Sequence, residues 1–81
     1  MEKSWFVYIL ECLDGSYYTG ITNDLDKRMI AHKKGTGSKY VRAKGFKELI
    51  SSKKYSSKSE ALKVEYKIKK LSKKDKLNFL I

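Results

Sequence analysis

Five side chains that can take part in phosphodiester chemistry are spread along the chain. Tyr8 and Tyr18 stand ten residues apart in two short apolar segments, and Arg28, His32 and Glu65 follow them. A phenol, a guanidinium, an imidazole and one carboxylate are the groups that metal-assisted phosphodiester cleavage needs when no carboxylate cluster is present. The sequence therefore predicts a site of this kind, provided that the fold brings these side chains together.

The chain is short and strongly basic. Its 81 residues are enough for one modest core, so we expect a single domain over residues 1–81. Nineteen Lys plus Arg against nine Asp plus Glu give a formal net charge of +10, and most of the basic residues follow Lys27. Such a field attracts polyanions, which makes nucleic acid the expected partner. Lysines that only solvate the helix surfaces are the alternative.

The sequence also predicts where the protein works. The single cysteine, Cys12, cannot form an intrachain disulfide, and no apolar run approaches the roughly 20 residues of a membrane span. Residues 1–4 lead into a strand-like segment rather than an apolar secretory segment. We therefore expect a cytoplasmic protein that does not contact membranes.

The expected fold is α+β, a small three-stranded antiparallel sheet flanked by helices in the order ββαβαα. Turn residues separate the strand-like segments, and capping residues with apolar periodicity mark the helices. We expect residues 35–40 to form a loop. The expected strands are Trp5–Cys12, Tyr17–Thr22 and Phe46–Tyr55, and the expected helices run from Asn23 or Asp24 to about Lys34, from Ser57 to about Leu71, and from Ser72 to near Phe79.

The length of the hairpin loop decides whether Tyr8 and Tyr18 share a face of the sheet, because side chains alternate along a strand. A two-residue turn would place the two phenols on opposite faces. A three-residue loop that ends with Gly15 in the left-handed conformation instead pairs Tyr8 with Gly20. We predict this loop, which places both phenols on one face next to a residue without a side chain.

Arg28 and His32 are four residues apart and therefore lie on one face of the expected first helix. Leu25 and Met29 should turn toward the sheet, so we expect Arg28 and His32 to point at the edge of the protein. An exposed arginine followed by an unrelated histidine is the alternative.

Glu65 lies on or beside the apolar stripe of its expected helix. The residues of that stripe are Ala61, Leu62, Ile68 and Leu71. A carboxylate in this position needs a partner, because burial of an unpaired charge is costly. A bound divalent cation would be such a partner, and an ion pair with Arg28 is the alternative.

The segments that carry the two tyrosines resemble the signature strands of the GIY-YIG endonuclease superfamily. Val7–Leu10 and Tyr18–Gly20 are similar to those strands, and Arg28 stands where the family has its catalytic arginine. His32 matches a position that carries His or Tyr, and Glu65 matches the metal-binding glutamate. The resemblance covers nearly the whole chain and points to the small stand-alone bacterial members of the uncharacterised, YhbQ-like type.

This resemblance implies a metal-dependent endonuclease with one Mg²⁺ or Mn²⁺ held by Glu65. It implies that Tyr18, with Tyr8 and His32 nearby, deprotonates the attacking water and that Arg28 contacts the phosphate. DNA is favoured over RNA, in structure-directed DNA processing or repair. The residues expected to contact nucleic acid are Ser38, Lys39, Tyr40 and Arg42. The alternatives are a non-catalytic basic nucleic-acid-binding module and a module that binds an acidic protein.

Overall fold

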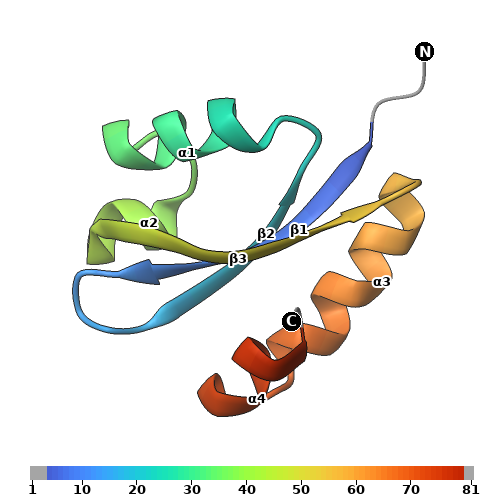
Figure 1. Ribbon diagram of the computed structural model, residues 1–81. Helices are drawn as coiled ribbons and strands as arrows, with labels where there is room; N and C mark the ends of the chain where they lie inside the picture. The colour runs from blue at the N-terminus through green and yellow to red at the C-terminus, as the bar shows by residue number, and fades with distance from the viewer. Residues whose placement is uncertain (1–3, 80–81) are drawn as a thin grey trace.

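A computed structural model of the chain describes residues 4–79. Three antiparallel strands lie in the order β2-β1-β3, with helices on both faces of the sheet (Figure 1). The strands are β1 (Trp5–Cys12), β2 (Tyr17–Thr22) and β3 (Phe46–Tyr55), and the helices are α1 (Leu25–Lys34), α2 (Lys39–Lys44), α3 (Lys58–Lys69) and α4 (Lys73–Phe79). The predicted α+β class and three-stranded antiparallel sheet are confirmed. Within residues 4–79, no helix is both long enough and apolar enough to cross a membrane.

The hairpin of β1 and β2 has the predicted register. Tyr8 stands opposite Gly20, and Leu10 stands opposite Tyr18. Gly15 completes the three-residue loop in the left-handed conformation, with a φ of 85°. Tyr8 and Tyr18 therefore lie on the same face of the sheet, as the loop length predicted.

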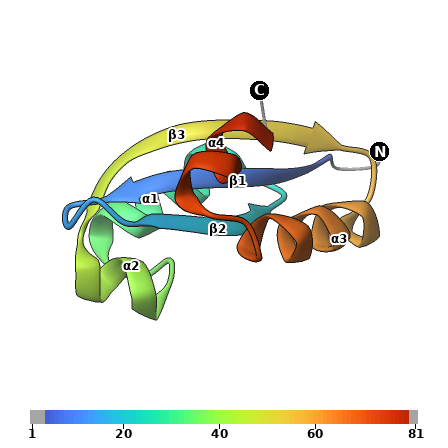
Figure 2. The ribbon, with the colours of Figure 1, turned by 90° about the horizontal axis from the view of Figure 1, so that it is seen from below.

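The two faces of β1 contribute to two separate hydrophobic cores. On one face, Val7 and Ile9 pack with Ala61 and Ile68 of α3. The core on the other face, which α1 and α2 cover, consists of Tyr8, Leu10, Cys12 and Val41. Figure 2 shows that α2 and α3 lie toward opposite ends of the sheet. The sheet thus separates a layer that contains α1 and α2 from a layer that contains α3.

Polar side chains fix the starts of the predicted helices. Asp24 accepts a hydrogen bond from the backbone N–H of Lys27 at 3.1 Å, and Ser57 accepts one from the N–H of Glu60 at 3.2 Å. Gly35 ends α1 in the left-handed conformation, with a φ of 82°. These caps satisfy backbone donors and acceptors that the first and last turns leave free. They confirm the start and the end predicted for the first helix.

The segment that was expected to be a loop up to Tyr40 is helical from Lys39 onward. The Oγ of Ser38 accepts a hydrogen bond from the N–H of Val41 at 3.1 Å and so starts the six-residue helix α2. The element order is therefore ββααβαα, with one helix more than predicted. The sequence showed no apolar periodicity here because α2 buries only Val41.

Helix α3 differs from its prediction in two details. It buries Ala61 and Ile68, with Val64 packed beside them. Leu62 was expected in this apolar stripe, but its side chain is 45% exposed. The helix also ends at Lys69, before the predicted end near Leu71. The outward position of Leu62 leaves an apolar side chain on the surface of α3.

Candidate active site

Tyr8 and His32 form a buried, hydrogen-bonded pair. The Oη of Tyr8 and the Nε2 of His32 are 2.8 Å apart, and both side chains are buried. Strand β1 positions the phenol, and the end of α1 positions the imidazole. Gly20 makes room for the phenol, because a Cβ at that position would lie 2.5 Å from the Tyr8 hydroxyl. Glycine is thus required at this point of β2 by the close approach of a side chain.

The expectation that His32 points at the edge of the protein is wrong. The imidazole is 2% exposed and stacks on the ring of Phe46, with 6.4 Å between the ring centres. Gly37 covers its other nitrogen, because a Cβ at Gly37 would lie 2.6 Å from Nδ1. That Nδ1 has no hydrogen-bond partner within residues 4–79. Neither Phe46 nor Gly37 was predicted as part of the site. The glycine-rich segment directly after α1 was a signal for Gly37 alone.

Tyr18 lies beside this pair and is partly open to solvent. Its ring centre is 5.7 Å from that of His32 and 6.4 Å from that of Tyr8. Tyr40 of α2 stacks on Tyr18, with ring centres 5.8 Å apart, and is itself 41% exposed. The four rings therefore lead from the buried pair to the surface. A substrate can reach Tyr18 and Tyr40 there, whereas His32 is enclosed.

Burial keeps both members of the pair neutral near neutral pH. Burial raises the pKa of Tyr8 well above its ordinary value, and the neighbouring phenol of Tyr18 acts in the same direction. Burial also lowers the pKa of His32 below 6.5, and the positive charge of Arg28 lowers it further. Tyr8 is thus a protonated phenol and His32 a neutral imidazole. Of the two phenols on this face, Tyr18 is the one that is accessible.

Arg28 approaches the same site from α1. Its positive charge lowers the pKa of Tyr8, against the effect of burial, and lowers the pKa of His32, in the same direction as burial. The guanidinium is therefore near both groups. Arg28 is partly exposed. It lines a cavity of about 240 Å³ together with Thr22, Asn23, Asp24, Lys27 and Ala31. An anion in this cavity would meet the guanidinium.

Glu65 belongs to the other layer of the fold. Helix α3 packs on the face of β1 opposite to that of Tyr8. Beside the larger effect of burial, the charge of Glu65 contributes to the raised pKa of Tyr8, so the carboxylate acts on the site electrostatically. The ion pair with Arg28 is absent from residues 4–79, where Glu65 instead pairs with Lys69, at 3.6 Å. Strand β2 is an edge strand of the sheet, and α3 contacts it as well as β1.

The donor chemistry of Glu65 fits a cation of the Mg²⁺ type. Mg²⁺ is usually held by one or two carboxylates together with water and phosphate oxygens. The side chain of Glu65 is 18% exposed, and that of its partner Lys69 is 54% exposed. The described part of the chain contains no group of three or more His, Cys, Asp or Glu side chains that could hold a metal ion. Glu65 offers one carboxylate, which fits a cation whose other ligands are water and phosphate oxygens.

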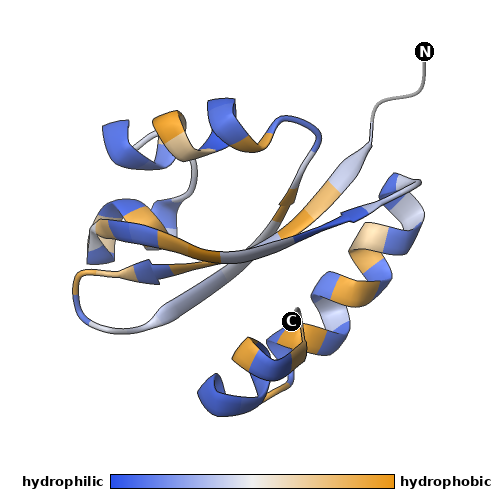
Figure 3. Cartoon of the chain, viewed as in Figure 1, coloured by the Kyte–Doolittle hydropathy of each residue, from blue (hydrophilic) through white to orange (hydrophobic). Residues whose placement is uncertain are grey.

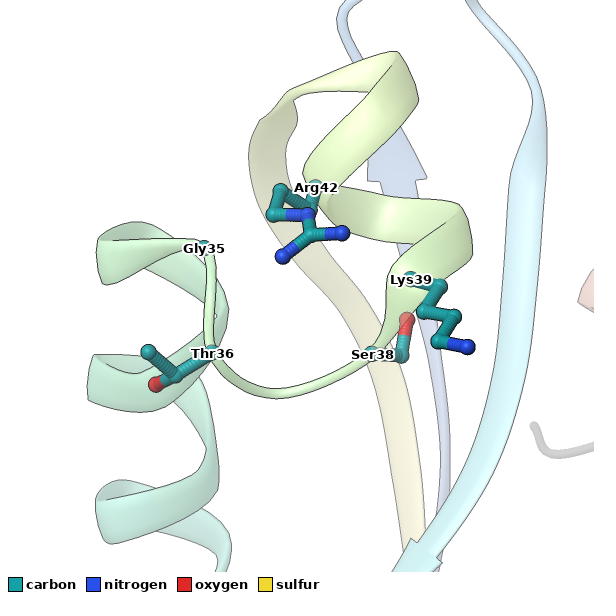
Figure 4. A pocket seen from close by; sticks show the side chains of 5 residues that line it. All are labelled: Gly35, Thr36, Ser38, Lys39 and Arg42. Atoms are coloured by element: carbon teal, nitrogen blue, oxygen red, sulfur yellow. The ribbon is translucent and has the colours of Figure 1, made fainter.

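The residues predicted to contact nucleic acid lie together around α2. A cavity of about 360 Å³ is lined by Gly35, Thr36, Ser38, Lys39 and Arg42 (Figure 4). Arg42 extends into this space, whereas Lys39 is directed toward β2. The hydroxyl of Ser38 holds the start of α2, and Tyr40 joins the group to Tyr18 through their stacked rings.

Acidification is expected to destabilise the folded protein through His32. Because the pKa of His32 is lowered from 6.5 in the folded state, the unfolded chain takes up the proton first as the pH falls. The stability that the neutral His32 contributes is fully present above pH 6.5. It is lost as the pH falls toward the pKa of His32 in the folded state, by up to about 1.4 kcal/mol per pH unit. His32 is the only histidine in the sequence. Urea unfolding at about pH 7.5 and about pH 5.5 measures the difference.

The H32Q variant is the control for this experiment. Glutamine can still form a hydrogen bond with Tyr8, but it does not titrate. We expect the free energy of unfolding of H32Q to change much less between the two pH values. A wild-type protein that is equally stable at both would contradict a buried, neutral imidazole.

The chain is similar to known proteins over nearly its whole length. The family model described as the GIY-YIG catalytic domain matches residues 4–78. The UPF0213 protein OB0043 of Oceanobacillus iheyensis is 45% identical over 80 residues, which cover 99% of this chain and 93% of that protein. The solution NMR structure of the protein EF2693 from E. faecalis has a TM-score of 0.67 and 43% identity, and the match covers 99% of this chain and 88% of that one.

One protein named UPF0213 also has a solved structure that is similar to this chain. The solution NMR structure of the UPF0213 protein BH0048 from Bacillus halodurans has a TM-score of 0.58 and 45% identity, and the match covers 94% of this chain and 81% of that one. The predicted resemblance to small stand-alone members is thereby confirmed. The chain belongs to the GIY-YIG family, and its relatives include the small proteins named UPF0213.

Proposed function

We propose that this protein is a metal-dependent endonuclease that hydrolyses phosphodiester bonds in nucleic acid, with DNA as the preferred substrate. The observation that carries the proposal is the accessible Tyr18 beside the buried Tyr8–His32 pair, with Arg28 near both. The GIY-YIG domain, which is that of a nuclease family, and the net charge of +10 support it.

In this proposal, each side chain of the site has a distinct task. Arg28 binds the phosphate, because a guanidinium can donate two hydrogen bonds to its oxygens and offset charge in the transition state. In its phenolate form, Tyr18 accepts the proton of the attacking water as the water oxygen bonds to phosphorus and the bond to the leaving oxygen breaks. The leaving oxygen then takes a proton from solvent. Tyr8 and His32 share a buried hydrogen bond, so this pair fixes the surroundings of Tyr18.

Glu65 would hold the one divalent cation, Mg²⁺ or Mn²⁺. When bound, such an ion supplies Lewis-acid polarisation of the phosphate and stabilises the leaving oxygen. The remaining contacts of the substrate would come from α2, where Lys39 and Arg42 contact phosphates and Tyr40 stacks on a base. Ser38 would support them by holding the start of α2. We further propose that the protein acts in the cytoplasm, in structure-directed DNA processing or repair.

Replacement of Glu65 by Gln should abolish metal-dependent cleavage. The change removes the charge of the proposed ligand but keeps its shape, and loss of several kcal/mol of stabilisation lowers the rate by about 100-fold or more. The assay incubates labelled single-stranded, duplex and branched oligonucleotides with Mn²⁺ or with a chelator and separates the products on a gel. Binding of the same oligonucleotides should remain within about threefold of the wild-type affinity.

The matched control is E60Q, which makes the same chemical change on the same helix. Glu60 accepts a hydrogen bond from Ser56 at 2.9 Å and is exposed, so E60Q should cleave at the wild-type rate. Full activity of E65Q, or wild-type cleavage that persists in chelator, would remove Glu65 from the proposed role. Salt-dependent binding without cleavage of any oligonucleotide would favour the alternative, a non-catalytic nucleic-acid-binding module.

A further inference from the structure

Helix α3 presents large apolar side chains to solvent. Leu62 is 45% exposed and Tyr66 is 63% exposed. They are four residues apart and therefore neighbours on one face of the helix. Lys70 continues this row, with its Nζ 4.2 Å from the centre of the Tyr66 ring. An exposed aromatic ring in this position contributes neither to the two cores nor to the candidate active site.

Lysines surround these two side chains, and we refer to Leu62, Lys63, Tyr66, Lys67 and Lys70 as the outer surface of α3. Between Lys58 and Phe79, eight lysines stand against three acidic residues. The three lysines of the outer surface are exposed, and within residues 4–79 none of them forms an ion pair. Figure 3 shows predominantly hydrophilic residues along α3 and α4, interrupted by separate apolar positions. The charge of this surface is complementary to a polyanion.

We propose that the outer surface of α3 binds an unpaired stretch of the nucleic acid whose phosphodiester lies at the candidate active site. Sites for single-stranded nucleic acid combine basic groups, which contact the backbone, with aromatic rings, on which bases stack. An acidic protein segment would be attracted by the same lysines, but it has no need of a flat ring among them. Tyr66 therefore favours nucleic acid as the occupant.

The position of this surface relative to Glu65 suggests the path of the strand. Tyr66 follows Glu65 in the sequence and lies about 100° farther around the helix. Lys69, which pairs with Glu65, lies between them on the same side of α3. A strand that passes Glu65 can thus continue past Lys69 to the ring of Tyr66. This inference goes beyond the proposed function: it depends on nucleic acid as the partner but does not require cleavage.

The test measures the affinity of the full-length protein for fluorescent oligothymidylates of about 6 and about 16 nucleotides, in chelator. The Y66L variant keeps an apolar side chain but loses the ring, and it should bind the longer oligonucleotide about 5- to 150-fold more weakly. Its affinity for the shorter oligonucleotide, which fills only the candidate active site, should not change. Y66W restores a ring and should restore the affinity for the longer oligonucleotide.

The lysines are tested with a charge-matched pair of double variants. K63Q/K67Q should make the slope of log affinity against log salt for the longer oligonucleotide less negative by about 1.4, or about 0.7 for each lost phosphate contact. K53Q/K54Q removes the same charge from β3, at the other edge of the sheet. The slope for K53Q/K54Q should equal that of the wild-type protein.

Two results would overturn the inference. One is wild-type affinity of Y66L for the longer oligonucleotide, or an equal loss for both lengths. The other is a polyglutamate peptide that competes with the longer oligonucleotide, binds as tightly as it does, and binds Y66L as tightly as the wild-type protein. That result would indicate an acidic protein partner. Cleavage in Mn²⁺ is measured separately, so a Tyr66-dependent affinity without cleavage would remove the endonuclease proposal and leave this inference intact.

Discussion

The Y18F variant should bind oligonucleotides with wild-type affinity and fail to cleave them. Phenylalanine keeps the ring contacts with His32 and Tyr40 and removes only the hydroxyl that would accept the proton of the attacking water. Loss of a general base typically lowers a rate by about 10²- to 10⁴-fold. The rate is measured under single-turnover conditions in Mn²⁺, and the affinity is measured by fluorescence anisotropy in chelator.

Tyr17 provides the control for this variant. It is adjacent in sequence, but its ring packs with the core that α3 covers, on the opposite face of the sheet. Y17F removes the same hydroxyl group and should cleave at the wild-type rate. Cleavage by Y18F as fast as that by Y17F would exclude Tyr18 as the base, whereas loss of binding by Y18F would show that its hydroxyl holds the substrate.

The G20A variant should be strongly destabilised. A Cβ at this position would lie 2.5 Å from the Oη and 2.7 Å from the Cζ of Tyr8, and 3.1 Å from the Cε2 of Tyr18. Tyr8 is fully buried and hydrogen-bonded to His32, so its ring cannot move away without disturbing the core. Overpacking of this kind typically costs about 1–3 kcal/mol, which urea denaturation measures as a lower free energy of unfolding.

A double-mutant cycle with Y8L isolates this collision. Leucine lacks the ring atoms that the new Cβ would meet, so G20A should cost much less in the Y8L background than in the wild-type protein. The expected coupling is on the order of 1 kcal/mol or more. An equal cost in both backgrounds would mean that G20A acts through the backbone of β2 and not through the phenol of Tyr8.

The sequence predicted those features of the site that local geometry determines. The side-chain alternation of a strand, together with the left-handed Gly15, was sufficient to predict that Tyr8 and Tyr18 share a face. The caps at Asp24 and Ser57 were likewise predictable, because they depend on residues within three positions of one another.

The features that the sequence did not predict depend on contacts between distant parts of the chain. His32 is buried because it packs against Phe46 of β3, and the sequence of α1 alone does not predict that contact. The pairing of β1 with β3 contains register shifts between Ile9 and Leu10 and between Glu11 and Cys12. Such irregularities are properties of two strands brought together by the fold, so neither strand reveals them alone.

The surroundings of Glu65 illustrate the same limit. The sequence predicted that this carboxylate needs a partner, and the helical spacing to Lys69 was visible. The alternative partner, Arg28, does not pair with Glu65 within residues 4–79, where Glu65 pairs with Lys69 instead. The role of Glu65 as a metal ligand, like the roles of the other site residues, stays a prediction for the experiments above.

The position of α3 has a consequence for how the protein is made. This helix covers the face of β1 that carries Val7 and Ile9, yet its residues 58–69 follow all three strands in the sequence. During synthesis from the N-terminus, that apolar face has no cover until α3 has left the ribosome, and exposed apolar surface of this kind favours aggregation. In the proposed mechanism, the site would also lack Glu65 until this helix has been made.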